Sequence, residues 1–289
     1  MSKLIIYGDN AQDIGAAFPG AHGAEMKKFP DGELYVRVPE NCKGKDVLII
    51  HRCYPEQNDN LMKLYLLLDA VYHQAPSSIK VFIPYLPYAR MDKQVKEGES
   101  ISADTVCRLL MKLGCNELIT VDCHFIKQGA GNFERAGLKI RNLTASDALL
   151  AHAHKTSPHA LVISPDQGAA YMAKGGESIK KVRGEYSSLG GTTYRKVAEM
   201  QVDFDAKGKD LIIIDDMVST GSTMIKATKV MKEAGAKKIS CVTSHGLFLS
   251  GALEKLKEAG ASEVAATDSI PTHVSKVKVA DLLKNSGAL

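Results

Sequence analysis

The sequence lacks several features that mark common classes of protein. It has no tryptophan, and its six cysteines are scattered, with no Cys-x-x-Cys pair among them. No apolar run approaches the roughly 20 residues that span a bilayer, and the first residues lack the length and cleavage site of a signal peptide. We therefore expect reduced thiols, a cytoplasmic location and no membrane partner.

The sequence also lacks a large excess of charge of either sign. The 37 Lys and Arg residues nearly balance the 33 Asp and Glu residues, and the net charge is +4. Opposite signs alternate along the chain, and no basic helix, zinc-finger spacing or helix-turn-helix pattern is visible. We expect anionic small molecules as ligands and no nucleic acid.

The 289 residues exceed the usual domain size of about 150 residues, which predicts two domains. The segment Gly44–Ile50 nearly repeats in Gly208–Ile214, and each copy opens a strand followed by a loop and a helix. This echo predicts two related α/β halves, 1–145 and 146–289, each a mainly parallel sheet flanked by helices.

One stretch carries a clear chemical signal. The apolar run Leu211–Ile214 predicts a short buried strand, with Asp215 and Asp216 at its carboxyl end. Residues 219–223 then offer small residues and hydroxyls directly before a helical pattern at 224–234. No Walker lysine is present, so the loop suits one phosphate, and the acids suit ribose hydroxyls or Mg²⁺. The alternative is a solvated strand end.

Other polar residues follow the remaining predicted strands, at the edge where open α/β sheets bind ligands. They are Arg90, Asp92, Asp122 and His124 in the first half and Asp166 in the second. The glycine- and serine-rich segment 178–191 predicts a mobile loop rather than a helix, and the charged segment 93–99 also predicts a mobile loop.

Seven motifs together resemble those of the ribose-phosphate pyrophosphokinases in order and spacing. They are Phe29-Pro-Asp-Gly-Glu33, Tyr88-Ala-Arg-Met-Asp92, Asp122-Cys-His124, Ser164-Pro-Asp-Gln-Gly168, Lys181-Val-Arg183, Asp215 to Thr223 and Ser244-His-Gly-Leu-Phe248. The resemblance covers nearly the whole chain. It implies two tandem phosphoribosyltransferase-like (type I) domains, with ATP motifs in 1–145 and the sugar-phosphate loop and catalytic lid in 146–289.

The resemblance also implies the reaction, in which the 1-hydroxyl of ribose 5-phosphate attacks the β-phosphorus of Mg-ATP and AMP leaves. The products are 5-phosphoribosyl 1-pyrophosphate and AMP. Catalysis of such a transfer rests on positioning and on neutralising charge. The family match further favours a homo-oligomer. The helical segment 60–74, with Leu61, Leu64, Leu68 and Val71 on one face, could serve an interface or the core.

Site residues follow from the matched motifs. The resemblance implies Lys181 and Arg183 as the catalytic pair, and His124 and Asp166 as metal-associated positions. The residues implied for ATP are Phe29, Asp31, Gly32, Glu33, Arg90, Met91 and His124. Those implied for pyrophosphate are Asp166, Gln167 and Gly168, and those for ribose 5-phosphate are Asp215, Asp216, Ser219, Thr220, Gly221, Ser222 and Thr223.

Three positions depart from the family pattern. Met91 stands where glutamine is usual, which removes a hydrogen bond to the nucleotide. Ala169 replaces a common glycine, and Ser219 replaces a frequent aspartate. Two other functions remain open on sequence grounds: a phosphoribosyltransferase that consumes phosphoribosyl pyrophosphate, and a non-catalytic regulatory homologue. The ATP-type motifs at 29–33 and Arg90 count against a phosphoribosyltransferase. The presence of Lys181, Arg183 and His124 counts against a non-catalytic homologue.

Overall fold

The computed structural model describes residues 2–174, 176–178, 180–182, 186–189, 192–195, 199–201 and 204–287, with side chains described outside 177–203. The chain forms two compact units. Unit 1 comprises Met1–Ala145, Asp268–Ile270 and Lys278–Leu289, and unit 2 comprises Ser146–Thr267 and Pro271–Val277. The predicted second domain, 146–289, therefore differs at its end, because the last helix belongs to unit 1.

Unit 1 is built on a sheet in the order β2-β1-β5-β6-β7-β9-β8, in which only the β8–β9 pair is antiparallel. Its strands are β1 (Lys3–Tyr7), β2 (His22–Gly23), β5 (Asp46–Ile50), β6 (Ser78–Phe82), β7 (Glu117–Val121), β8 (Gly131–Arg135) and β9 (Leu138–Leu143). The apolar runs of the central strands suit a sheet that is covered by helices.

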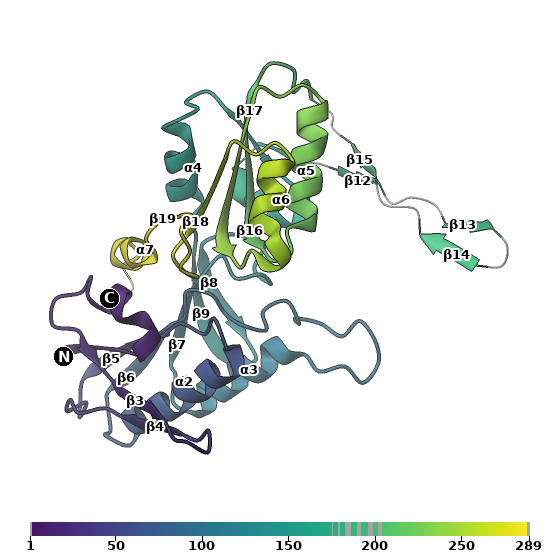
Figure 1. The fold of residues 1–289 in the computed structure, drawn as a ribbon. Helices are drawn as coiled ribbons and strands as arrows, with labels where there is room; N and C mark the ends of the chain where they lie inside the picture. The colour runs from purple at the N-terminus through teal and green to yellow at the C-terminus, as the bar shows by residue number, and fades with distance from the viewer. Residues whose placement is uncertain are drawn as a thin grey trace. The chain divides into compact units, whose positions relative to one another are not determined.

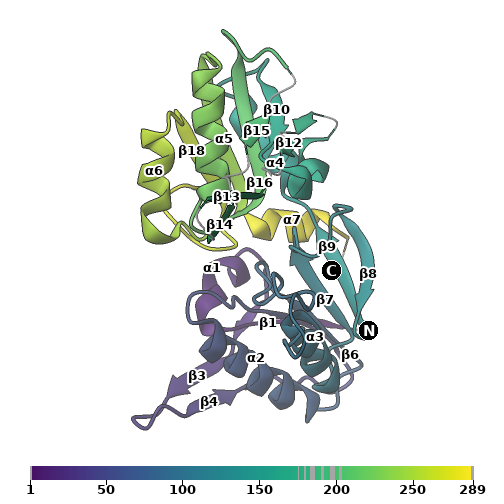
Figure 2. The same cartoon turned by 90° about the vertical axis from the view of Figure 1, so that its right-hand side faces the viewer.

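Two helices, α2 (Gln57–Tyr72) and α3 (Ser102–Lys112), cover one face of this sheet and contact each other (Figure 2). The predicted apolar face of α2 is confirmed, and Leu61, Leu64, Leu68 and Val71 are all buried in the core of unit 1. Core packing, rather than an interface, is therefore the use of this face. The short segments η1 (Asp9–Ala11) and α1 (Gln12–Gly15) follow β1.

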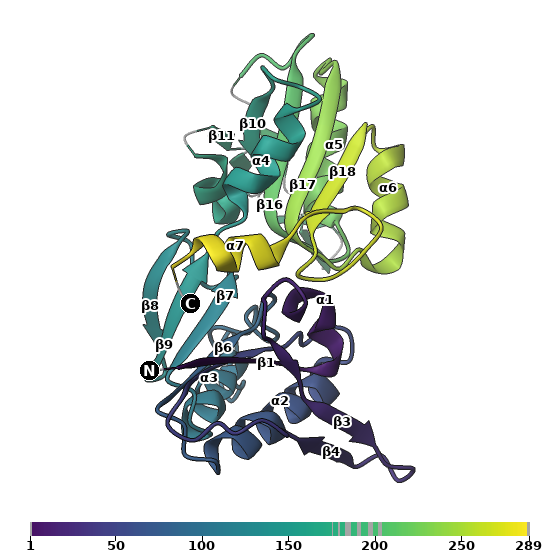
Figure 3. The ribbon, with the colours of Figure 1, turned by 90° about the vertical axis from the view of Figure 1, so that its left-hand side faces the viewer.

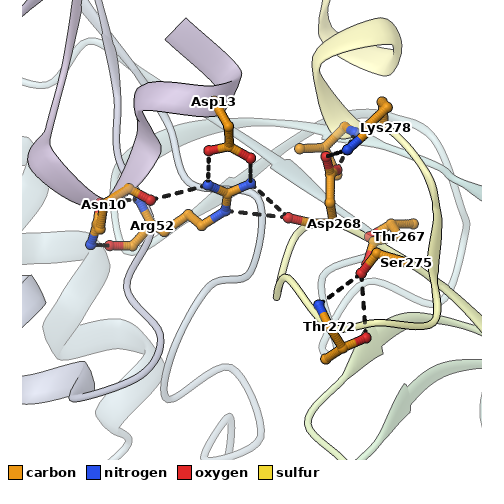
Figure 4. A network of polar contacts seen from close by, with 9 residues as sticks. Asn10, Asp13, Arg52, Thr267, Asp268, Thr272, Ser275 and Lys278 are labelled. Carbon is orange, nitrogen blue, oxygen red and sulfur yellow. Dashed lines mark hydrogen bonds and ion pairs between the residues drawn. The ribbon is translucent and has the colours of Figure 1, made fainter.

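The end of the chain is held in unit 1 by a buried arginine. Arg52 donates hydrogen bonds to both carboxylate oxygens of Asp13 and to the carbonyls of Asn10 and Asp268 (Figure 4). The Asp268 carboxylate then accepts from the backbone N–H of Val279 at 2.7 Å, at the start of α7 (Val279–Asn285). These bonds place α7 beside α1 (Figure 3).

Unit 2 is built on a parallel sheet in the order β11-β10-β16-β17-β18-β19. Its strands are β10 (Leu161–Ser164), β11 (Glu177–Ser178), β16 (Asp210–Val218), β17 (Lys238–Gly246), β18 (Glu263–Thr267) and β19 (Ser275–Val277). Helices α5 (Ser222–Glu233) and α6 (Ala252–Glu258) cover one face, and α4 (Ser146–His154) lies on the other (Figure 1). The short segments η2 (Gln167–Ala173) and η3 (Leu249–Gly251) follow β10 and β17.

The repeated sequence segments have the same local structure in both units. Gly44 and Gly208 adopt φ values of +66° and +71° before β5 and β16. The N–H groups of Lys45 and Lys209 each donate to a carbonyl three residues earlier, at 3.1 Å in both cases. Glycine is required at this turn because a side chain at positive φ is strained. The predicted internal repeat thus appears in the structure as the same glycine turn before β5 and before β16.

Three helices end in the same way before a strand. The glycines that end α3, α5 and α6 are Gly114, Gly235 and Gly260, with φ between +85° and +107°. In each case the next residue donates its N–H to a carbonyl in the last helical turn, which is a Schellman motif. A glycine that follows a helical pattern is the sequence signal for this kind of helix end, and Gly114 and Gly235 both fit it.

The segment after η2 contains short strands in its described parts. They are β12 (Lys180–Val182), β13 (Tyr186–Leu189), β14 (Thr192–Arg195) and β15 (Glu199–Gln201), and β12 pairs with β15 as β13 pairs with β14. The expectation that 178–191 is not a helix holds for its described residues. Its expected mobility stays a prediction.

Candidate active site

The acid pair of unit 2 lies inside a strand rather than after it, which corrects the sequence prediction. β16 continues to Val218 because Asp215, Met217 and Val218 keep pairing with β17, Asp215 opposite Thr243. Asp216 is buried, with an exposed fraction of 4%, and its N–H donates to Asp215 Oδ1 at 2.9 Å. The strand backbone therefore holds both carboxylates rigidly.

Burial and like charge act together on this pair. Burial raises the pKa of Asp215 well above its ordinary value of 3.8, and the neighbouring charges of Asp216 and then Asp166 raise it further. Three carboxyl groups thus repel one another in a poorly hydrated place. A cation, or hydroxyl groups that donate hydrogen bonds, would relieve that repulsion.

The loop after β16 leads into the N-terminus of α5. Gly221 has φ +75°, and a Cβ built there would lie 3.1 Å from both Ala252 Cβ and Ile225 Cδ1. The N-cap residue of α5 is Gly221, which has no side chain to cap the helix, so the N–H groups of the first turn point toward the loop with the positive end of the helix dipole. The carbonyl of Ser219 accepts from the N–H of Leu249 at 2.9 Å, which ties the loop to the segment after β17.

Asp166 follows β10, the strand next to β16. Its Oδ1 accepts from the N–H of Gly168 at 2.8 Å, which fixes the carboxylate at the start of η2. Gln167 is exposed, Gly168 is half-buried, and the methyl group of Ala169 is fully buried in the core. Asp166 is thus near enough to Asp215 in unit 2 for its charge to raise the pKa of Asp215. This agrees with the prediction that polar residues gather at the carboxyl edge of the sheet.

Unit 1 supplies a second set of strand-end residues. Arg90 is exposed in the turn after β6, where the N–H of Met91 donates to the carbonyl of Tyr88 at 2.9 Å. Met91 is 48% exposed, and its carbonyl accepts from Ala103 at the start of α3. In the adjoining segment 93–99, the Glu99 side chain accepts from the N–H groups of Val95 and Lys96 and so closes a turn.

Asp122 and His124 follow β7. Asp122 is fully buried at φ +38°, its N–H donates to Leu143, and its Oδ2 accepts from the N–H of Ala145 at 2.9 Å. Asn142 accepts from the N–H of Cys123 at 2.9 Å. His124 is half-buried in the turn that these bonds hold.

The turn at 29–33 stands apart from these strand ends, at the exposed tip of the hairpin formed by β3 (Glu25–Lys28) and β4 (Leu34–Arg37). Gly32 has φ +96°, and Asp31 Oδ1 accepts from the N–H of Glu33 at 3.1 Å. Phe29 is 48% exposed, and its ring lies edge-on to the ring of Tyr35, with 6.3 Å between the two ring centroids. An exposed aromatic face of this kind suits a flat ligand.

The predicted catalytic pair cannot be placed in the same detail. Lys181 lies in β12, where the backbone alone is described, and Arg183 lies outside the described residues. Sequence reasoning also missed Thr243, which is buried opposite Asp215. Its hydroxyl has no hydrogen-bond partner within the described residues. Only the strand register, which an apolar run does not reveal, could have paired it with Asp215.

Four further observations concern metal ligands, membrane-spanning helices and cysteines. Among the described residues, no three His, Cys, Asp or Glu side chains gather closely enough to hold a metal ion. His124 belongs to unit 1, whereas Asp166 belongs to unit 2. Over the same part of the chain, no helix has the length and apolar character needed to cross a membrane. All six cysteines are free and buried.

Comparisons with known proteins agree with the motifs. Residues 19–114 match the family described as the N-terminal domain of ribose phosphate pyrophosphokinase. Residues 173–285 match the phosphoribosyl synthetase-associated domain. The ribose-phosphate pyrophosphokinase of Pyrococcus abyssi is 35% identical over 99% of both chains. That of Sulfolobus acidocaldarius is 34% identical over 89% of this chain and 88% of its own.

A solved structure extends the likeness to the fold. The crystal structure of phosphoribosylpyrophosphate synthetase from Mycobacterium smegmatis superposes with a TM-score of 0.81 at 26% identity, and covers 99% of this chain and 97% of its own. The predicted tandem phosphoribosyltransferase-like fold is confirmed by this match. The chain belongs to the ribose-phosphate pyrophosphokinase family and is an enzyme.

Proposed function

We propose that this chain transfers the β,γ-diphosphate of ATP to the 1-hydroxyl of ribose 5-phosphate, which yields 5-phosphoribosyl 1-pyrophosphate and AMP. The family membership supports this reaction. The single structural observation that carries it is that one strand, loop and helix place the buried acids Asp215 and Asp216 shortly before the uncapped N-terminus of α5. Carboxylates and backbone N–H groups there suit the two ends of one sugar phosphate.

In the sugar half of the site, the loop 219–223 binds the 5-phosphate through backbone N–H groups and hydroxyls. Asp215 and Asp216 accept hydrogen bonds from the ribose hydroxyls. Their mutual repulsion favours such donors, because hydroxyl groups stabilise the charged carboxylates that burial destabilises. Asp166, Gln167 and Gly168 bind the incoming pyrophosphate.

In the nucleotide half, the exposed Arg90 suits the phosphates of ATP through its fork of donors. Phe29 supports the adenine, and Asp31, Gly32 and Glu33 read the base and its ribose. Met91 lies at the same turn and offers no side-chain hydrogen bond. Discrimination among diphosphate donors therefore rests on the other residues.

Mg²⁺ fits the chemistry of the donor set, because the carboxylate of Asp166 is held in one orientation by Gly168 and lies near Asp215. Asp166 would hold such an ion beside the pyrophosphate and the sugar, and His124 would hold one beside the nucleotide. A bound ion would neutralise charge on the phosphates of ATP. Lys181 and Arg183 are the cations that we assign to the transferred diphosphate, where they stabilise negative charge as it moves to the sugar.

The test is to incubate the purified protein with ATP, Mg²⁺ and ribose 5-phosphate and to measure AMP and phosphoribosyl pyrophosphate. We expect both products in equal amounts. Lys181→Ala should bind both substrates and lose most turnover, by about 100-fold or more. Nucleotide binding without AMP release under any divalent metal would instead favour a regulatory homologue. Consumption of phosphoribosyl pyrophosphate with a base would favour a transferase.

We also propose a cytoplasmic location and a homo-oligomer. The first is supported by free, buried cysteines: burial raises the pKa of Cys107 to about 11 and that of Cys241 to about 12, so both stay protonated. The second follows from the family resemblance. Size-exclusion chromatography with light scattering measures it directly.

A further inference from the structure

Arg135 touches two separate segments of unit 1 that the proposed function assigns to ATP. It is the last residue of β8, at the hairpin turn into β9. Its Nη2 donates to the backbone carbonyl of Asp92 at 2.6 Å, two residues beyond Arg90. Its guanidinium carbon lies 4.3 Å from the ring centroid of Phe125, the residue that follows His124.

A third contact fixes the orientation of the guanidinium. Arg135 Nε donates to Asp104 Oδ1 at 2.6 Å, in the first turn of α3. The side chains of Arg135 and Asp104 are 20% and 26% exposed, so water screens the pair only partly. A guanidinium held by a carboxylate, a carbonyl and an aromatic face has few alternative positions.

The hairpin that carries Arg135 is itself rigid. Ala136 and Gly137, the turn residues, have φ values of +51° and +85°, which is typical of a tight two-residue turn. A Cβ built at Gly137 would lie 3.0 Å from the Met111 sulfur, so the turn packs closely on α3. The position of Arg135 is thus set by the sheet rather than by the segments that it contacts.

We propose that Arg135 is a positioning residue for the ATP half of the site, which holds the Arg90 turn and the His124 turn in one fixed relation. The inference rests on the proposed function, because it presumes that these two turns bind ATP. Arg135 itself contacts backbone, a ring and a carboxylate, and it acts on the nucleotide through the turns. Its loss should weaken ATP binding and leave the sugar half unchanged.

The experiment compares Arg135→Lys with Arg141→Lys. Arg141 lies on the adjacent strand β9, donates to Glu117 at 2.9 Å and is 27% exposed. Both arginines therefore lie in one sheet, and each is paired with a carboxylate. Lysine cannot make the forked and stacked contacts of Arg135. We expect Arg135→Lys to raise the KM for ATP about tenfold, with the KM for ribose 5-phosphate and kcat within about twofold to threefold of wild type.

Arg141→Lys should leave all three constants within about twofold of wild type. A second variant, Phe125→Leu, keeps apolar bulk but removes the ring, and it should raise the KM for ATP in the same direction by a smaller factor. Equal effects of Arg135→Lys and Arg141→Lys, or a parallel loss in kcat and both KM values, would overturn the inference. Failure of the wild-type protein to release AMP would instead defeat the proposed function.

Discussion

Asp215 occupies a position where its charged form is unfavourable, because the carboxyl group is poorly hydrated and has acidic neighbours. Its strand is buried and pairs on one side with β17, so the carboxyl group loses water and gains acidic neighbours. Natural sites keep such an unfavourable charge when a ligand compensates for it. Stability and ligand binding should therefore respond in opposite directions when the charge is removed.

We predict that Asp215→Asn raises the unfolding midpoint of unit 2 at pH 7 by about 2 °C or more. An acid whose pKa is higher in the folded chain stabilises it below the unfolded value of 3.8, and that stability is lost as pH rises through the folded pKa. The variant should remove this loss. Calorimetry across pH 4–8 measures it, with the exposed Asp205→Asn as the unchanged control.

The same variant should bind ribose 5-phosphate more weakly, because an amide replaces a charged acceptor. An unchanged or lower midpoint at pH 7 would mean that Asp215 is not strained by burial and like charge. In that case the acid pair would be an ordinary polar strand end.

At the scale of elements, the unit that binds the sugar phosphate is the sequence of strand, loop and helix from β16 to α5. The loop is held at both ends: its start is tied to the segment after β17, and Gly221 begins the helix at positive φ. Such a loop presents backbone N–H groups without having to reorganise when the ligand binds.

Gly221→Ala should test whether this geometry is needed. We expect it to lower the free energy of unfolding by about 1–2 kcal/mol for the backbone conformation alone, and further through contact with Ala252 and Ile225. The matched control is Gly208→Ala, where φ is +71° and a Cβ would meet no atom within 4 Å. Urea denaturation compares the two.

The kinetic expectation separates the two glycines further. Gly221→Ala should raise the KM for ribose 5-phosphate several-fold, whereas Gly208→Ala should leave it unchanged, because only the first lies at the phosphate loop. Similar values for both variants would contradict the assignment of loop 219–223 to the phosphate.

At the scale of the molecule, the two units share a construction and differ in the polar residues of their candidate sites. Unit 2 has the acid pair and an uncapped helix, and unit 1 has Arg90 and His124 in turns held by backbone hydrogen bonds. Each unit has its own core. The phosphate loop at 219–223 and the turns that carry Arg90 and His124 should therefore respond to different substrates.

We predict distinct patterns of amide hydrogen exchange. Saturating ribose 5-phosphate should slow exchange about tenfold at 219–224, and Mg-ATP should slow it at 88–92 and 122–126. The core helix α2 serves as the internal reference for each unit-1 measurement. Protection of 219–224 by Mg-ATP alone, without ribose 5-phosphate, would contradict the division of roles between the units.

The sequence by itself determined the elements that depend on local patterns. The apolar face of α2, the helix-ending glycines Gly114 and Gly235, and the echo between Gly44 and Gly208 all follow from periodicity and backbone preference. The motifs likewise identified the family, because the order and spacing of residue types can be compared without knowing how the strands pair.

Only the tertiary structure decided the contacts that join distant segments. The extension of β16 through Asp215 depends on its pairing with β17, which local composition cannot show, because polar residues are usually strand ends. The return of α7 to unit 1 depends on Arg52 reaching Asp268, and Arg135 acquires its role by meeting Asp92 and Phe125. Such long-range hydrogen bonds leave no periodic trace in the sequence, since either partner alone resembles an ordinary surface residue.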